Sequence, residues 1–160
     1  MKNFVHTIMT PLGNLVASAD DEFITSLDFT DEPMNTQNSD HPLLLCLEKE
    51  LQEYFAGKRR DFTLPLAPKG TPFQKGVWDT LRTIPYGDTI SYAKEAERFG
   101  NPKAVRAVGS ANGRNPIAIL IPCHRVIASD GTLGGYSGGI EKKKFLLQLE
   151  KETLSGRVLM

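Results

Sequence analysis

The sequence predicts an α+β protein, with a small N-terminal α/β domain followed by a mostly helical C-terminal domain that contains a helix-turn-helix. Three observations lead to this prediction. Residues 3–29 hold three short β-rich runs with brief spacers, whereas residues 71–155 hold apolar residues at helical spacing. Between them, residues 67–72 (APKGTP) have the composition of a linker. A chain of 160 residues can form two small packed domains, and we expect them at 1–68 and 72–155.

The N-terminal domain is expected to begin with an antiparallel strand meander and to continue with one helix. The runs NFVHTIMT, NLVASA and FITSLDF are separated by only three residues each, and such spacing is typical of hairpin-connected strands. The helix is indicated by apolar side chains at helical spacing before Gly57, a residue type that commonly ends helices: Leu44, Leu47, Leu51, Tyr54 and Phe55. The segment DFTLPL (61–66) is predicted to add one more strand.

The C-terminal domain is expected to open with three helices. Thr71-Pro72 is a favourable pair for the N-cap and first helical position, and residues 73–81 place Phe73, Val77, Trp78 and Leu81 on one face. A second helix should run from about Ser91 to Phe99 and end at Gly100. Asn101-Pro102 is a similar capping pair that should open a third helix over 103–113. Two short helices joined by about three residues that include glycine form a helix-turn-helix.

The third helix has one face with very little side-chain volume. Arg106, Gly109, Ser110 and Gly113 lie at i, i+3, i+4 and i+7, while Ala104, Val105 and Val108 can pack inward. Glycine inside a helix costs roughly 1 kcal/mol relative to alanine. Something is therefore expected to approach this backbone closely, and both a nucleic-acid groove and tight helix packing fit the pattern.

The charges are unevenly distributed although the net charge is zero. Residues 1–70 contain 6 Lys and Arg against 11 Asp and Glu, whereas residues 71–160 contain 13 against 8. A basic half suggests that the C-terminal part meets a polyanion, with a chance split as the alternative. The chain shows no signal peptide, no run of about 18 uncharged apolar residues and no disulfide framework. We expect a cytoplasmic protein that does not enter a membrane.

The stretch IPCHRV (121–126) places one of only two cysteines at the end of an apolar run, residues 117–121, which is expected to be a buried strand. A free thiol has a pKa of about 8.5, so nucleophilic chemistry at Cys123 needs a nearby base or cation. His124 is adjacent, but neighbours in a regular strand point to opposite faces. The two side chains can cooperate only if the strand ends in a turn or a water bridges them. The alternative is a buried structural cysteine.

Glu150 is a candidate partner for His124. The last helix, IEKKKFLLQLEKE (140–152), has its apolar stripe at Phe145, Leu146 and Leu149, so Glu150 lies at the edge of the inward face. A carboxylate buried there needs a partner, and His124 would complete a Glu–His–Cys relay. A surface glutamate paired with Lys151 or Arg157 is the alternative.

Metal and cofactor sites are not indicated by the sequence. His6, His41 and Cys46 do not have the spacing of a zinc site. The chain has no phosphate-binding loop and no Gly-x-Gly-x-x-Gly motif. We therefore expect neither a metal nor a cofactor.

Residues 115–139, NPIAILIPCHRVIASDGTLGGYSGG, resemble the signature of the O6-alkylguanine-DNA alkyltransferases, also called methylated-DNA–protein-cysteine methyltransferases. The resemblance extends back through ISYAKEA and NPKAVRAVGSANGRNP and forward to Glu150, so it covers roughly residues 70–152. The N-terminal 70 residues resemble the family only in outline.

The resemblance implies a DNA-repair enzyme. Such a protein transfers an alkyl group, usually methyl, irreversibly from O6-alkylguanine in duplex DNA to its own cysteine after flipping the base. O4-alkylthymine is a second candidate substrate. The resemblance further implies a monomer that binds double-stranded DNA from the minor groove, acts once and uses no cofactor.

The resemblance also implies residue roles. Cys123 would be the nucleophile, His124 and Glu150 would draw its proton through a water, and Tyr92 would donate to N3 of the leaving guanine. Arg106 would fill the gap left by the flipped nucleotide. The substrate pocket would include Asn115, Val126, Tyr136 and Ser137, and the DNA-binding set would be Asn101, Arg106, Ala107, Gly109, Ser110 and Ser129.

Two other functions fit parts of the sequence. A non-catalytic DNA-binding module that recognises alkylated bases would leave Cys123 inert. A transcriptional regulator with a sensory domain is disfavoured, because the N-terminal part has no cluster of reactive cysteines and the minor groove distinguishes sequence poorly.

Overall fold

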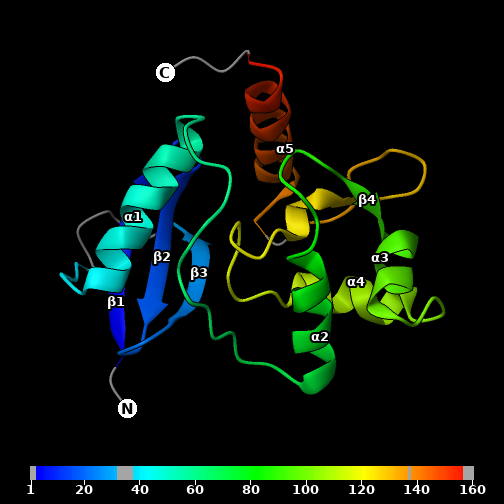
Figure 1. Ribbon diagram of the computed structural model, residues 1–160, viewed down its shortest axis with the longest axis horizontal. Coiled ribbons are helices and arrows are strands. Elements are labelled where there is room, and N and C mark those ends of the chain that lie inside the picture. The colour runs from blue at the N-terminus through cyan, green and yellow to red at the C-terminus, as the bar shows by residue number, and fades with distance from the viewer. Residues whose placement is uncertain (1–2, 32–37, 137, 157–160) are drawn as a thin grey trace.

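A computed structural model describes residues 3–31, 38–136 and 138–156 (Figure 1). It has the predicted α+β fold, in which a three-stranded antiparallel sheet is followed by helices. Ser137, which the family resemblance assigns to the substrate pocket, lies outside the described residues.

The predicted strand meander is confirmed. Strands β1 (Phe4–Thr10), β2 (Gly13–Ala19) and β3 (Ile24–Thr30) pair in the order β1-β2-β3, with β2 in the middle. Leu15, Ala17 and Ala19 are buried and alternate with half-buried residues along β2, because successive side chains of a strand point to opposite faces.

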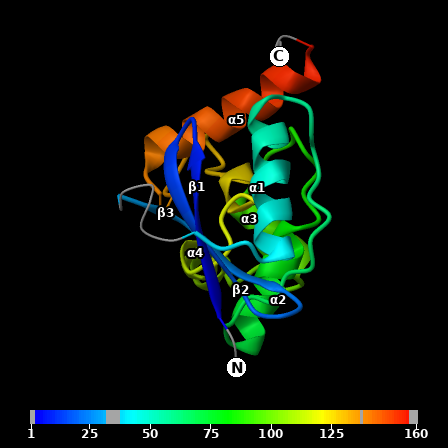
Figure 2. The same ribbon diagram turned by 90° about the vertical axis from the view of Figure 1, so that its left-hand side faces the viewer.

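The predicted helix over the sheet is confirmed as α1 (Pro42–Phe55), which packs against β1 and β2 (Figure 2). Its inward stripe is fully buried, as the helical spacing indicated: Leu44, Leu47, Leu51 and Tyr54. Apolar burial on both elements therefore holds α1 to the sheet.

The prediction of a strand at 61–66 is wrong. Only an isolated parallel bridge joins Leu66 to Ile24, with the Ile24 amide donating to the Pro65 carbonyl at 2.9 Å. Proline has no amide hydrogen with which to continue a ladder. Thr63 is instead held by the carboxylate of Glu50, which accepts from its hydroxyl at 2.6 Å and from its amide at 3.1 Å.

The helix-turn-helix region matches the prediction in element order. Helix α2 (Pro72–Leu81) begins with a capping box in which Thr71 and Gln74 exchange hydrogen bonds. The two-residue strand β4 (Ile90–Ser91) precedes α3 (Tyr92–Phe99), and α4 (Val105–Gly113) follows. These three helices share a small core made of Val77, Ala96, Val108 and Ala111.

The capping role expected for Asn101-Pro102 is wrong. The Asn101 amide donates to the Ala96 carbonyl at 3.0 Å and so completes the end of α3, where Gly100 has a φ of 101°. Helix α4 begins at Val105, two residues later than expected, and its N-cap residue Ala104 makes no side-chain hydrogen bond.

The apolar run at 117–121 is buried as expected, but the strand prediction is wrong. Asn115 closes the segment into a loop, because its carboxamide donates to the Ile121 carbonyl at 2.7 Å and accepts from the Ile117 amide at 2.9 Å. The loop leads into a 3₁₀ helix (Cys123–Arg125) and then into β5 (Val126–Ile127), which pairs in parallel with β4.

The chain's last described helix is α5 (Ile140–Leu154), and its buried residues are Lys143, Leu146, Leu149 and Glu150. Phe145, expected in the inward stripe, is 39% exposed and packs only at the edge, 6.3 Å from the ring of Phe55. Lys143 takes the inward position one turn before Leu146 instead. No helix in the described part of the chain is both long and apolar enough to span a membrane.

Candidate active site and nucleic-acid interface

Cys123 lies at a pocket formed where α3, α4, the 3₁₀ helix and the loop after β5 converge. The pocket has a volume of about 290 Å³. Cys123 itself is 8% exposed, so its thiol is shielded from bulk water but borders the cavity. The residues that line it are Tyr92, Gly109, Asn112, Gly113, Cys123, Gly135 and Tyr136. A small molecule or a single base that entered this pocket would therefore meet the sulfur.

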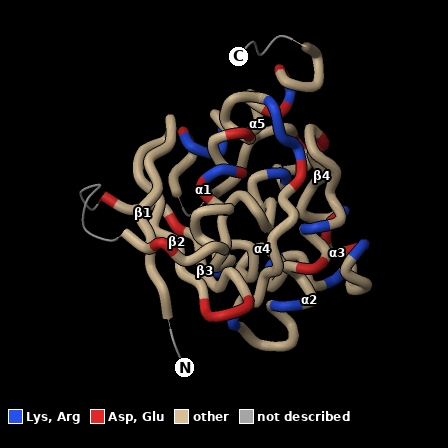
Figure 3. Tube along the Cα trace, turned by 60° about the vertical axis from the view of Figure 1, so that its left-hand side comes forward, with Lys and Arg blue, Asp and Glu red and all other residues tan. Residues whose placement is uncertain are grey.

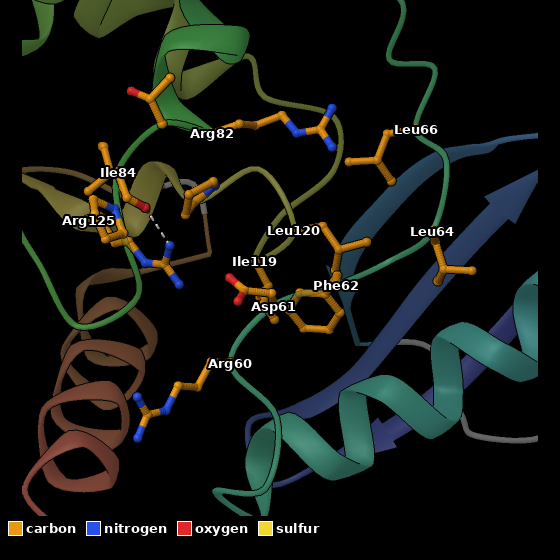
Figure 4. Close-up of a pocket in the computed structure, with 13 residues that line it drawn as sticks. Arg60, Asp61, Phe62, Leu64, Leu66, Arg82, Ile84, Ile119, Leu120 and Arg125 are labelled. Atoms are coloured by element: carbon orange, nitrogen blue, oxygen red, sulfur yellow. Dashed lines mark hydrogen bonds between the residues drawn. The ribbon is translucent and has the colours of Figure 1, made fainter.

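A second hollow is bordered by Pro122 and Arg125, the residues on either side of Cys123 and His124 in the sequence (Figure 4). It has a volume of about 180 Å³ and is bordered by the segment around Phe62, the loop around Ile119 and Arg125. The guanidinium of Arg125 is already occupied there, because it donates to the Ile84 carbonyl at 2.8 Å. Cys123 and His124 do not line this hollow, so we place the candidate active site in the first pocket.

The structure brings His124 and Glu150 together. His124 Nε2 lies 2.7 Å from Glu150 Oε2, and both side chains are buried. Cys123 and His124 lie in a 3₁₀ helix and not in a strand, so their side chains are not forced to opposite faces of a sheet. Glu150 therefore has the histidine partner, and the alternative of a surface glutamate does not hold.

Glu150 also accepts hydrogen bonds that the sequence did not indicate. Arg125 binds both of its oxygens, at 2.8 and 3.0 Å, Tyr54 donates its hydroxyl at 2.6 Å, and the Gly87 amide donates at 3.3 Å. Burial raises the pKa of this carboxyl, but His124 and Arg125 lower it by more, so the pKa lies well below its usual range. Glu150 is consequently an ionised buried anion that joins α1, α5 and the 3₁₀ helix.

His124 is oriented as a base toward the interior. Burial lowers the pKa of His124, while the adjacent Glu150 raises it. Because Nε2 faces a carboxylate, it carries the proton, and Nδ1 is left as an acceptor. In the described part of the chain this buried Nδ1 has no hydrogen-bond partner. A proton can therefore be received there.

Lys143 is a buried cation beside the thiol, and the sequence analysis missed it. Its ammonium donates to the Val126 carbonyl at 2.6 Å and to the Gly135 carbonyl at 3.1 Å. Burial raises the pKa of the Cys123 thiol, whereas Asn115 and the charge of Lys143 lower it. Lys143 lies three residues before Leu146 and seven before Glu150, so helical spacing could have placed it on the inward face.

Replacing Lys143 with methionine should slow the reaction of Cys123 with iodoacetamide at neutral pH by about tenfold, because the charge that lowers the pKa of the thiol is lost. The rate of alkylation at Cys123 can be followed by peptide mass spectrometry. Lys144→Met is the matched control, since Lys144 is exposed on the same helix. Equal rates for the two variants would show that the Lys143 charge does not act on the thiol.

Two tyrosines form the walls of the pocket. Burial raises the pKa of Tyr92 and, more strongly, that of Tyr136, so both hydroxyls stay protonated and can donate. Gly134, with φ of 73°, lets the loop pass Tyr92 closely, since an added Cβ would lie 2.7 Å from the Tyr92 hydroxyl. The Tyr136 ring packs edge-on against Phe29 of β3 at 6.1 Å. The N-terminal sheet therefore braces this side of the pocket.

The residues expected to bind DNA lie beside the same pocket. Arg106, Ala107 and Ser110 are exposed on α4, and Gly109 lines the cavity. A Cβ built on Gly109 would lie 3.8 Å from the Tyr92 ring, an ordinary contact, and one on Gly113 would meet nothing within 4 Å. Packing within the protein therefore does not require these glycines, which favours an external partner.

The remaining predicted site residues lie around this face. Asn101 and Ser129 are exposed in turns. Neither Asn115 nor Val126 is among the residues that line the pocket. The Asn115 side chain instead holds the 117–121 loop, and the Val126 carbonyl accepts a hydrogen bond from Lys143.

The charge distribution separates the two halves in space (Figure 3). The sheet region, residues 3–31, contains five acidic residues and no Lys or Arg, whereas blue segments lie around α2 and α3 and also along α5. The basic residues of the C-terminal half therefore lie away from the sheet.

Fold and site together define a class of protein in which a helix-turn-helix borders a pocket that ends at a thiol, with a buried histidine–glutamate pair behind it. Two family profiles match the chain: "6-O-methylguanine DNA methyltransferase, DNA binding domain" over residues 72–152 and the "ribonuclease-like domain" of the same family over residues 3–68. The chain belongs to the 6-O-methylguanine DNA methyltransferase family.

Individual relatives agree with this assignment. The constitutive methylated-DNA–protein-cysteine methyltransferase of Bacillus subtilis is 47% identical over 93% of this chain and 96% of its own length. The Haemophilus influenzae protein of the same name is 45% identical over 89% and 83%. Among solved structures, Mycobacterium tuberculosis OGT in complex with DNA superposes with a TM-score of 0.86 at 43% identity, covering 94% of both chains.

Proposed function

We propose that this protein repairs alkylated DNA by transferring the alkyl group of O6-alkylguanine to Cys123, irreversibly and once per molecule. The observation that carries the proposal is the position of Cys123, which borders a base-sized pocket beside the helix-turn-helix and precedes His124, the partner of Glu150, in the 3₁₀ helix. The activity named for the relatives that are 45–47% identical supports it.

The reaction begins with the proton of the thiol. A water in the pocket relays it from Cys123 to the free Nδ1 of His124, and the imidazolium is stabilised by Glu150, which stays ionised. Lys143 stabilises the thiolate that forms.

The thiolate then attacks the alkyl carbon. A sulfur–carbon bond forms as the carbon–O6 bond breaks, and the electron pair of the broken bond stays on the guanine. Tyr92, whose hydroxyl remains protonated, donates to N3 of the departing base. The product at Cys123 is a thioether, which is a very poor leaving group, so each molecule acts only once.

The face of the protein that carries α4 and the pocket would also bind the DNA. We propose that α4 enters the minor groove, where its small residues Ala107, Gly109 and Ser110 allow close approach, and that the target base is flipped into the pocket. Arg106 would occupy the space that the base leaves. The protein would act as a monomer in a reducing compartment, the cytoplasm, with separate domains at 1–68 and 72–155.

The fate of the DNA distinguishes this proposal from a binding-only module. A duplex with one O6-methylguanine is incubated with excess protein and digested to nucleosides for chromatography. The proposal requires unmodified guanine in place of O6-methylguanine. Binding that leaves the methylated base intact would support the non-catalytic alternative instead.

Arg106→Ala should lower the rate of methyl transfer from duplex DNA by roughly 10- to 100-fold. Base flipping costs a few kcal/mol, and without the arginine no side chain fills the space that the flipped base leaves. Transfer from the free base O6-benzylguanine should change little, since no flipping is needed. Arg60→Ala, which removes an exposed arginine from the acidic half, is the control. Equal losses on both substrates would contradict the role of Arg106.

A further inference from the structure

Glu95 is a buried carboxyl that neither the fold nor the proposed chemistry explains. It lies on α3, at the inner side of the helix-turn-helix, and its exposed fraction is 0%. Its carboxyl contacts α4, where Asn112 Nδ2 donates to Glu95 Oε1 at 2.7 Å. A buried carboxylate is costly unless it is paired with a cation, and Glu150 shows how this chain solves that problem with Arg125.

Glu95 has no such cation among the described residues. The ionisable groups that face it are Tyr92 on the same helix and Cys123 on the 3₁₀ helix. A negative charge on Glu95 raises the pKa of both groups, so neither can serve as its counter-charge. Lys143 from α5 lies over the Tyr92 ring at 5.8 Å, and its ammonium is bound by the Val126 and Gly135 carbonyls. No salt bridge to Glu95 is present in the described part of the chain.

The two unpaired atoms of this contact are complementary. Within the described residues, Glu95 Oε2 and Asn112 Oδ1 are both buried and have no hydrogen-bond partner. If Glu95 is ionised, both atoms are acceptors and neither can satisfy the other. If Oε2 carries a proton, it can donate to the Asn112 carbonyl while the Asn112 amide donates to Oε1, and one proton satisfies both atoms.

We propose that Glu95 is held as a neutral carboxylic acid, joined to Asn112 by two hydrogen bonds, and that this proton-dependent pair sets the position of α4 against α3 at the wall of the pocket. Burial supports the neutral form, since it raises the pKa of Glu95 to about 7 although the Asn112 hydrogen bond lowers it.

The pair connects to the active site through Asn112. Asn112 lines the pocket together with Tyr92 and Cys123, so its position shapes the cavity. Loss of the proton would break one of the two hydrogen bonds and place a negative charge near the thiol, which raises the pKa of Cys123. Glu95 is therefore a positioning residue for alkyl transfer, and this consequence alone rests on the proposed function.

The protonation state can be read directly by NMR. Protein labelled with ¹³C at glutamate carboxyls is titrated from about pH 4 to 9, and the Glu95 resonance is assigned through its backbone and by its absence in Glu95→Gln. A carboxyl that is neutral at pH 6 and titrates near 7 is expected. Titration near the ordinary value of about 4.3 would overturn the proposal. Glu97, exposed on the same helix, is the internal comparison.

Stability gives a second test, because glutamine mimics the protonated acid. A carboxyl whose pKa is raised on folding stabilises the protein fully below its unfolded pKa and loses that contribution as pH rises through the folded pKa. Wild type and Glu95→Gln should therefore unfold alike near pH 4. By about pH 8 the unfolding equilibrium constant of the wild type should be larger by roughly 500-fold relative to the variant.

Glu97→Gln should show no such pH-dependent gap. If the difference in stability between wild type and Glu95→Gln did not change with pH, the proposal would be contradicted. If the variant does not fold, the NMR titration of the wild type alone decides whether Glu95 is neutral. Both readouts hold even if alkyl transfer fails. In the transfer assay, the rate of Glu95→Gln relative to wild type should rise from near one below pH 6 to several-fold above pH 8.

Discussion

Replacing Glu150 with glutamine is expected to lower the free energy of unfolding by about 3–5 kcal/mol, the usual effect of removing one partner from a buried ion pair. The carboxylate accepts from Arg125 twice, and from His124, Tyr54 and Gly87. A glutamine amide would turn its own donors toward these donors and leave the arginine charge buried without a counter-charge. Urea unfolding at neutral pH measures the loss.

The same substitution should remove the contribution of Glu150 to the pH dependence of the free energy of unfolding. Although burial raises the pKa of Glu150, His124 and Arg125 bring it well below the usual range. A carboxyl with a lowered folded pKa stabilises the protein above its unfolded pKa, about 4.3, and loses this contribution as pH falls. The gap between wild type and Glu150→Gln should therefore narrow below about pH 4. Glu141→Gln, exposed on the same helix, is the control, and a loss no larger than in this control would refute the network.

Cys123→Ser should abolish alkyl transfer while leaving binding to alkylated duplex DNA close to that of the wild type. A serine hydroxyl has nearly the size of a thiol, but it is far less acidic and less nucleophilic. The exposed residues of α4, Arg106, Ala107 and Ser110, are unchanged by this substitution. Transfer is measured with a radiolabelled methyl group and binding by fluorescence anisotropy.

Cys46→Ser is the matched control, because Cys46 is the other cysteine of the chain and lies exposed on α1, which is remote from the pocket lining. It should transfer methyl groups at the wild-type rate. Transfer by Cys123→Ser, or its loss in Cys46→Ser, would contradict the assignment of the nucleophile.

Much of the fold could be predicted because its signals are local. The spacers 11–13 and 20–22 indicated the meander, and helix caps such as Thr71 and Gly100 lie within a few residues of the ends they define. The errors arose where side chains or neighbouring elements decide the backbone. Asn115 bends an apolar run that would otherwise favour a strand, and Asn101 completes one helix instead of opening the next.

The candidate site could be predicted in part for the same reason. His124 and Glu150 were paired from helical spacing and the requirement that a buried charge have a partner. The contributions of Tyr54 and Lys143 were missed, because they depend on how α1 and α5 dock against the 3₁₀ helix. Glu95 could have been noticed, since it shares the inward face of α3 with Ala96, but its partner lies on another helix.

The central claim, that the sulfur of Cys123 takes and keeps the alkyl group, is tested most directly by the mass of the protein itself. The protein is incubated with a molar excess of duplex DNA that contains O6-methylguanine, and the intact chain and its peptides are weighed. The account predicts a gain of one methylene unit, located at Cys123, and no further demethylation of DNA after one equivalent. An unchanged mass, or continued turnover by the same molecules, would contradict it.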